Sequence, residues 1–209
     1  PLNFIQIADV LGGIPGRRDE GLFAETKKLI SSVDRAPDFL LFNGDHVAGY
    51  CSLEELRSQW DYFLHGESVS YPFPVYHIPG NHDVVSLTET LPNPYGRSFP
   101  NAEAEELFRK AFPEIPENGP EGQRGLAYFV EGEQYILIVL HSIYSGRSST
   151  GFNEGAWLDR TLEHFKDKPV KLLASHFPVF PVNGYDRHAP YPHASWIINP
   201  REGRILWDI

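Results

Sequence analysis

The segment Phe73-Pro-Val-Tyr-His-Ile-Pro-Gly-Asn-His-Asp83 joins an apolar run to a group of small and polar residues. The run Phe73–Ile78 is typical of a buried β-strand, and Gly80 supplies the backbone freedom that a sharp turn after a strand requires. The amide oxygen of Asn81 can bind a metal ion, and the imidazole of His82 can bind one or carry a proton. The segment therefore predicts a strand that ends in a functional loop.

Three further strands are predicted to end in an acid or an imidazole. They are Phe4-Ile-Gln-Ile-Ala-Asp9, Phe39-Leu-Leu-Phe-Asn-Gly-Asp45 and Val170-Lys-Leu-Leu-Ala-Ser-His176. Asp45 lies 36 residues after Asp9 and 36 residues before Asn81, a spacing that fits successive strand–helix units. In an open α/β sheet, ligands bind outside the carboxyl ends of the strands, so these side chains are expected to converge.

Helical patterns separate the predicted strands. Apolar residues recur at helical spacing between Glu20 and Val33, and Ser52 stands three residues before Glu55, which is a capping-box pattern for a helix over Ser52–Leu64. We expect further a proline-interrupted loop insertion over Pro92–Gln123 with a helix at Ala102–Ala111, a hairpin of Leu126–Val130 and Gln134–Leu140, and a helix from Asn153, as its N-cap, to about Phe165. The alternation predicts one α/β domain over residues 1–209.

The order of these motifs resembles that of the calcineurin-like metallophosphoesterases. The matching residues are Asp9, Gly44-Asp45, Gly80-Asn81-His82-Asp83 and His176, so the resemblance extends over almost the whole chain. It implies two facing mixed β-sheets flanked by helices. It also implies a dinuclear centre of two divalent or mixed-valence transition metal ions, and the mixed nitrogen and oxygen ligands suit Mn, Fe or Zn.

The resemblance implies a role for each matching residue. Asp45 is expected to bridge the two ions, because a carboxylate has two oxygens, and His82 to protonate the leaving oxygen with Asp83 behind it as an orienting carboxylate. The expected metal ligands are Asp9, Asp45, Asn81 and His176.

Two parts of the family pattern are missing. The family's first motif is Asp-x-His, whereas Leu11 follows Asp9 at that spacing, although some relatives place Gln there. The terminal Gly-His-x-His motif is also absent, and the resemblance would place it shortly after Ile209. Because the chain in addition contains no methionine, we expect the sequence to be incomplete at its C-terminus.

Several other residues have open interpretations. His46 could touch the substrate, lie behind the metal ligands or be exposed, while His77 is expected to pack inside its strand and His141 to lie near the site without binding metal. The loop Asn183–His188, with Tyr191 and His193, is either an aromatic surface loop or a contact for a phosphate or a base.

Composition restricts the partners. The formal net charge of −10 opposes binding to nucleic acid, which requires cationic side chains, but a local metal centre can still hold a small phosphate ester. Apolar runs such as Tyr135–Leu140 are too short to cross a membrane. The single cysteine, Cys51, excludes an intrachain disulfide and favours a reducing compartment, so we expect a cytoplasmic protein.

The sequence thus predicts a metal-dependent phosphoesterase that hydrolyses a small phosphomonoester or phosphodiester by a metal-bridging hydroxide, with His82 as the general acid. The alternative is a metal-depleted, catalytically silent binding or scaffold domain, because Leu11 and the missing terminal histidines leave the first ion with only Asp9 and Asp45. A purely structural α/β domain would need four coincidences in the correct order.

Overall fold

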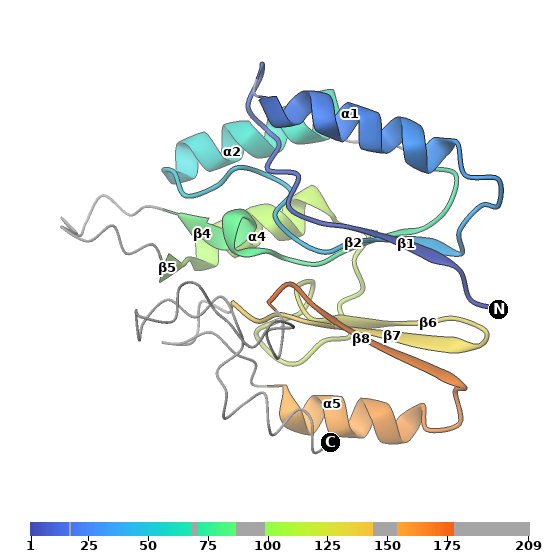
Figure 1. The fold of residues 1–209 in the computed structure, drawn as a ribbon. Coiled ribbons are helices and arrows are strands. Elements are labelled where there is room, and N and C mark those ends of the chain that lie inside the picture. Colours follow the sequence, from blue (N-terminus) through green and yellow to red (C-terminus); the bar gives the residue numbers. More distant parts are fainter. Residues whose placement is uncertain (17, 68–70, 87–98, 144–153, 178–209) are drawn as a thin grey trace, which may run out of the picture. The chain divides into compact units, whose positions relative to one another are not determined.

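The computed structural model describes residues 1–16, 18–67, 71–86, 99–143 and 154–177 (Figure 1). The chain separates into two compact units, residues 1–115 and 116–209. The predicted loop Asn183–His188 lies outside the described residues, as do Tyr191 and His193. Within the described part of the chain, no helix combines the length and the apolar character that crossing a membrane requires.

The first unit is built on a three-stranded parallel sheet. Its strands are β1 (Phe4–Ile7), β2 (Phe39–Phe42) and β3 (Val75–His77), in the order β1-β2-β3. All four residues of β2 are buried, as expected for the central strand of a parallel sheet covered on both faces. The three strands lie within the predicted runs, so this part of the expected topology is confirmed.

Helices and a short two-stranded sheet complete the first unit (Figure 1). The helix α1 (Arg18–Ser31) connects β1 to β2, and α2 (Leu53–Tyr62) continues into a π-helical turn, η1 (Phe63–Glu67). The remaining elements are α3 (Asn81–Val84), β4 (Val85–Ser86), β5 (Phe99–Pro100) and α4 (Ala102–Ala111). The predicted helix Ala102–Ala111 is therefore confirmed, and it packs against α2 and α3.

The predicted capping box begins α2. The hydroxyl of Ser52 accepts a hydrogen bond from the backbone N–H of Glu55 at 3.2 Å, and the carboxylate of Glu55 accepts one from the backbone N–H of Ser52 at 3.4 Å. These two bonds satisfy N–H groups that have no partner within the helix. The helix start, and with it the length of the loop between β2 and α2, is thus fixed locally.

The second unit contains a mixed three-stranded sheet. Its strands β6 (Tyr128–Glu131) and β7 (Tyr135–Leu140) form the predicted antiparallel hairpin, and β8 (Val170–Ser175) pairs in parallel with β7. The helix α5 (Gly155–His164) makes the crossover from β7 to β8 and lies on one face of this sheet (Figure 1). The residue at the N-cap of α5 is Glu154, one residue after the expected cap Asn153, which lies outside the described residues.

We expect Ser52→Ala to lower the free energy of unfolding by about 1 kcal/mol, because it removes the acceptor for the Glu55 N–H at the start of α2. Urea unfolding measures the change. Ser58→Ala is the matched control, since the Ser58 hydroxyl is exposed and bonds only back to the Glu54 carbonyl within the helix. Equal unfolding free energies for both variants would contradict a stabilising capping box.

Candidate metal centre

Three candidate ligands follow the ends of the three parallel strands of the first unit. Asp9 follows β1, Asp45 follows β2 and Asn81 follows β3, so all three stand at the same edge of the sheet. The segments after β1 and β2 remain paired, because the Asp9 N–H donates to the Gly44 carbonyl at 3.1 Å and the Leu11 N–H donates to the Asp45 carbonyl at 3.0 Å. The predicted convergence of these strand ends is therefore present in the backbone.

The carboxylates of Asp9 and Asp45 lie close together. One oxygen of each lies within 4.8 Å of the other, and both residues adopt a left-handed backbone with φ of 58°. Asp45 is only 4% exposed, whereas Asp9 is exposed. Two carboxylates this close repel each other, and burial adds a desolvation cost, so a bound cation would stabilise the pair.

The loop after β3 packs directly on Asp45. A methyl group added at Gly80 would lie 2.2 Å from Oδ1 of Asp45 and 2.3 Å from its backbone nitrogen, so only glycine fits there. The backbone N–H of His82 donates to Oδ1 of Asp45 at 3.0 Å, and Nε2 of His82 lies 3.7 Å from Oδ2. Asp45 is therefore held between the two loops.

The ring of His82 is oriented by a backbone carbonyl. Its Nδ1 hydrogen-bonds to the carbonyl oxygen of Ala48, and because a carbonyl only accepts, Nδ1 carries the hydrogen. The other nitrogen, Nε2, faces Oδ2 of Asp45. His82 is thus half-buried, and a backbone carbonyl sets the orientation of its ring.

Asp83 is fully buried and holds the loops after β2 and β3 together. Its carboxylate accepts four backbone N–H groups, from Gly80 at 2.8 Å, His46 at 2.8 Å, Asp45 at 3.0 Å and Val47 at 3.3 Å. The role that the sequence suggests for Asp83, an orienting carboxylate behind His82, stays a prediction. The contact that fixes the His82 ring comes from Ala48, and Asp83 contributes by holding the loop that leads to Ala48.

His46 lies behind Asp45, within an aromatic cluster. It is fully buried and stacks on Phe42 with ring centroids 3.9 Å apart, which rules out the exposed position that the sequence left open. Its Nδ1 bonds to Asp83 at 2.9 Å and its Nε2 lies 3.0 Å from Nδ1 of His77. Burial, with a smaller contribution from the His46 imidazole, lowers the pKa of His77 well below its ordinary value.

Tyr50 contacts two candidate site residues, although no motif in the sequence indicated it. Its hydroxyl accepts a hydrogen bond from Nδ2 of Asn81 at 2.9 Å, and its ring meets the His82 ring edge to face at 4.5 Å. Burial raises the pKa of the Tyr50 phenol, the bond from Asn81 lowers it, and the charge of Asp45 raises it further. The only sequence signal is an aromatic residue five positions after Asp45, next to a glycine.

In the second unit, two histidines follow neighbouring parallel strands. His141 follows β7 and His176 follows β8, and the register pairs the preceding residues Leu140 and Ser175. His141 is fully buried, whereas His176 is half-buried. His176 thus stands where the sequence predicts, at the carboxyl end of a strand.

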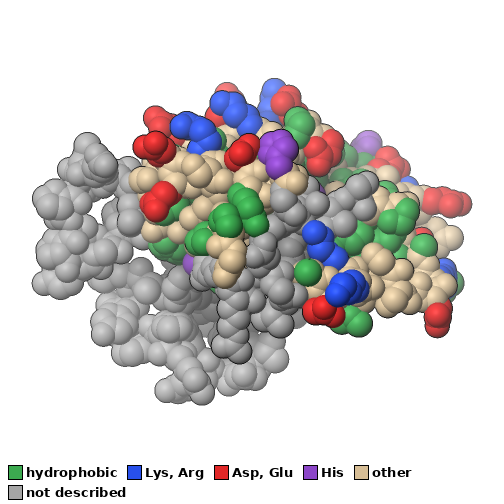
Figure 2. Space-filling model, turned by 90° about the horizontal axis from the view of Figure 1, so that it is seen from above, with side chains coloured by type: hydrophobic (Ala, Val, Ile, Leu, Met, Phe, Trp, Pro, Cys, Tyr) green, Lys and Arg blue, Asp and Glu red, His purple; other side chains and the backbone are tan. Residues whose placement is uncertain are grey.

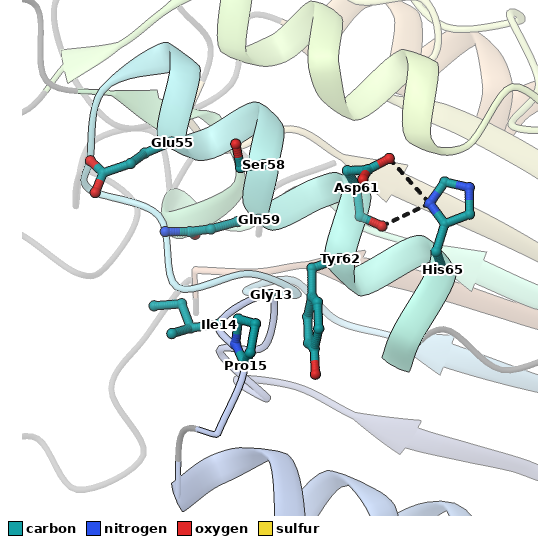
Figure 3. A pocket seen from close by; sticks show the side chains of 9 residues that line it. All are labelled: Gly13, Ile14, Pro15, Glu55, Ser58, Gln59, Asp61, Tyr62 and His65. Atoms are coloured by element: carbon teal, nitrogen blue, oxygen red, sulfur yellow. Dashed lines mark hydrogen bonds and ion pairs between the residues drawn. The ribbon is translucent and has the colours of Figure 1, made fainter.

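A separate hollow in the first unit holds none of the predicted ligands. It has a volume of about 630 Å³ and lies between α2 and the loop after β1 (Figure 3). Nδ1 of His65 lies 3.2 Å from Oδ1 of Asp61 at this hollow, but both side chains are exposed, so the pair contributes little to stability. Its lining residues are Gly13, Ile14, Pro15, Glu55, Ser58, Gln59, Asp61, Tyr62 and His65.

Comparison with known proteins decides the family. Residues 2–204 match the sequence model of the calcineurin-like phosphoesterases. The chain belongs to this family. The predicted resemblance is confirmed, and the match covers residues of both units.

Among solved structures, the chain is similar to the purple acid phosphatase PPD1 from seeds of yellow lupin, Lupinus luteus, with 16% sequence identity and a TM-score of 0.51. The similarity covers 85% of this chain but only 30% of the lupin enzyme. At this identity the likeness supports the fold alone, and it agrees with the predicted α/β architecture of two sheets and helices. A search of curated proteins gives no significant match.

We expect Asp83→Asn to lower the free energy of unfolding by about 3 kcal/mol, because an amide nitrogen would face backbone N–H groups that now donate to a carboxylate. Urea unfolding measures the loss. The control is Asp61→Asn, which changes an exposed carboxylate on α2 in the same way. A loss as small as that of the control would show that the carboxylate does not hold the two loops.

Proposed function

We propose that this phosphoesterase hydrolyses small phosphomonoesters or phosphodiesters at a centre of two transition metal ions, Mn, Fe or Zn. The observation that carries the proposal is the buried Asp45 carboxylate, which lies beside Asp9 and is contacted by the start of α3, where Asn81 and His82 lie. Such a set of oxygen donors, together with a nearby imidazole, fits divalent cations that accept oxygen and nitrogen ligands.

The proposed ligands are Asp9, Asp45, Asn81 and His176. Asp9 and Asp45 offer oxygens within 4.8 Å of each other, and Asp45 has a second oxygen with which it can bridge. Support for including His176 comes from the family match, which spans both units, and from its position after β8. When bound, the two ions would supply a hydroxide nucleophile at neutral pH and offset charge on the phosphoryl oxygens.

His82 is proposed as the general acid. Because Ala48 fixes Nδ1 as a donor, a proton bound at Nε2 is positioned at the Asp45 side of the ring, where the leaving oxygen would accept it. Asp83 stabilises the loop after β2, which leads to Ala48, by accepting hydrogen bonds from the backbone N–H of His46 and from its ring.

A cysteine nucleophile, another chemistry by which phosphate esters are hydrolysed, is disfavoured. Burial and the charge of Glu55 raise the pKa of the Cys51 thiol to about 11, so it stays protonated at neutral pH. Cys51 is also the only cysteine, which supports the proposal of a reducing, cytoplasmic environment.

The substrate is proposed to be small rather than polymeric. The net charge is −10, and acidic and basic side chains are interspersed on the face that Figure 2 shows. An extended anion such as nucleic acid needs a continuous basic surface. A single phosphate ester needs only the local field of the metal centre.

One observation favours the alternative of a silent, metal-depleted domain. Leu11 replaces the histidine of the family's first motif, and its backbone N–H bonds to the Asp45 carbonyl at 3.0 Å. A leucine side chain cannot bind the first ion, so that ion depends on Asp9 and Asp45 within the first unit. Metal analysis separates this alternative from an active enzyme.

We expect Asp45→Asn to lose bound metal and to reduce hydrolysis of p-nitrophenyl phosphate at least about 100-fold, because an amide cannot bridge two cations as a carboxylate does. Elemental analysis and steady-state rates measure both effects. Asp61→Asn serves as the control and is expected to keep metal and rate. Full metal content and full activity in Asp45→Asn would remove the bridging assignment.

His82→Ala is expected to retain bound metal while losing rate unequally between substrates. Phenyl phosphate, whose leaving group needs a proton, should lose about 10²-fold or more, and p-nitrophenyl phosphate should lose much less. The ratio of the two kcat values is the measurement, with the exposed His65→Ala as control. An equal loss on both substrates would argue against His82 as the acid.

A further inference from the structure

We infer that Tyr50 is a positioning residue that orients the side-chain amide of Asn81, so that Oδ1 of Asn81 is presented to a metal ion. The inference deepens the proposed function and rests on it. The phenol stands 2.9 Å from Nδ2 of Asn81. With the nitrogen held by Tyr50, the amide oxygen becomes the donor for a cation.

An asparagine ligand needs such an orienting contact more than an aspartate does. Only one of its two terminal atoms can bind a cation, and a rotation of the amide by half a turn would present an NH₂ group instead. Partners that hold a metal ligand from behind typically affect metal affinity by about 10-fold to 100-fold. The Tyr50 hydroxyl makes the contact that selects the productive orientation.

The ring of Tyr50 is itself well fixed. It packs edge to face on His82 with centroids 4.5 Å apart and an interplanar angle of 71°. Its backbone has a φ of 51°, a left-handed conformation that is unfavourable for a residue other than glycine. Such a conformation persists where the surroundings determine it.

Those surroundings come from α2 and from the backbone of His82 in α3. The backbone N–H of Gly49 donates to Oε1 of the buried Gln59 at 2.8 Å. A methyl group added at Gly49 would lie 1.9 Å from the His82 carbonyl oxygen, so this loop packs against the backbone of His82. Tyr50 is thus placed by α2 and by the backbone of His82, and it contacts two candidate site residues, Asn81 and His82.

The test is the affinity of the metal-free full chain for Mn²⁺, measured by isothermal titration calorimetry. We expect Tyr50→Phe, which keeps the ring and removes only the hydroxyl, to raise the Kd about 10-fold. Tyr62→Phe, a change of the same kind on α2, is the matched control and should leave the Kd unchanged. Thermal unfolding of the metal-free variants verifies that both are folded.

The same Tyr50→Phe change made in an Asn81→Asp variant distinguishes an effect on the orientation of the residue 81 side chain from a general structural effect. Asp has two equivalent oxygens, so in Asn81→Asp the orientation of the side chain no longer matters, and adding Tyr50→Phe should change the Kd less than twofold. A Kd for Tyr50→Phe alone that stays within twofold of the natural chain overturns the inference, as does an equal rise in both backgrounds. If the natural chain binds no Mn²⁺, the proposed function fails and the inference falls with it.

Discussion

The candidate site of the first unit depends on the hydrogen bonds that backbone N–H groups donate to the buried carboxylate of Asp83. An ionised carboxylate away from water is costly unless donors surround it, and here four backbone N–H groups and the His46 imidazole do so. Because those donors belong to the loops after β2 and β3, a single side chain fixes both. Asp45 lies in the first of these loops, and Asn81 and His82 begin α3 directly after the second.

Packing supports this polar arrangement on its far side. His46 lies among the rings of Phe42, Trp60 and Phe112, so that β2, α2 and the end of α4 all contact the residue next to Asp45. Close approach of backbones at Gly80 and Gly49 leaves no space for a side chain. The positions of the candidate ligands are therefore set by the core of the first unit as well as by hydrogen bonds.

Local signals explain what the sequence could predict. Short stretches of sequence are enough to predict the capping box at Ser52, the helix Ala102–Ala111 and the apolar strands. The parallel topology of the strands then places Asp9, Asp45 and Asn81 at one edge of the sheet. The contacts of Asp83 and Tyr50 could not be predicted in the same way. Except for the bond from Gly80 to Asp83, they join residues 31 to 38 positions apart, through loops with left-handed backbone that no periodicity describes. The inclusion of His176, in the second unit, remains a prediction.

The most direct test of the central claim is metal stoichiometry by elemental analysis of the purified chain, measured beside hydrolysis of p-nitrophenyl phosphate and bis-p-nitrophenyl phosphate with added Mn²⁺. A dinuclear phosphoesterase predicts two transition metal ions per chain and turnover of at least one ester, and the preferred ester identifies the substrate class. One ion or none, with no turnover of either ester, would contradict the account and favour the silent domain.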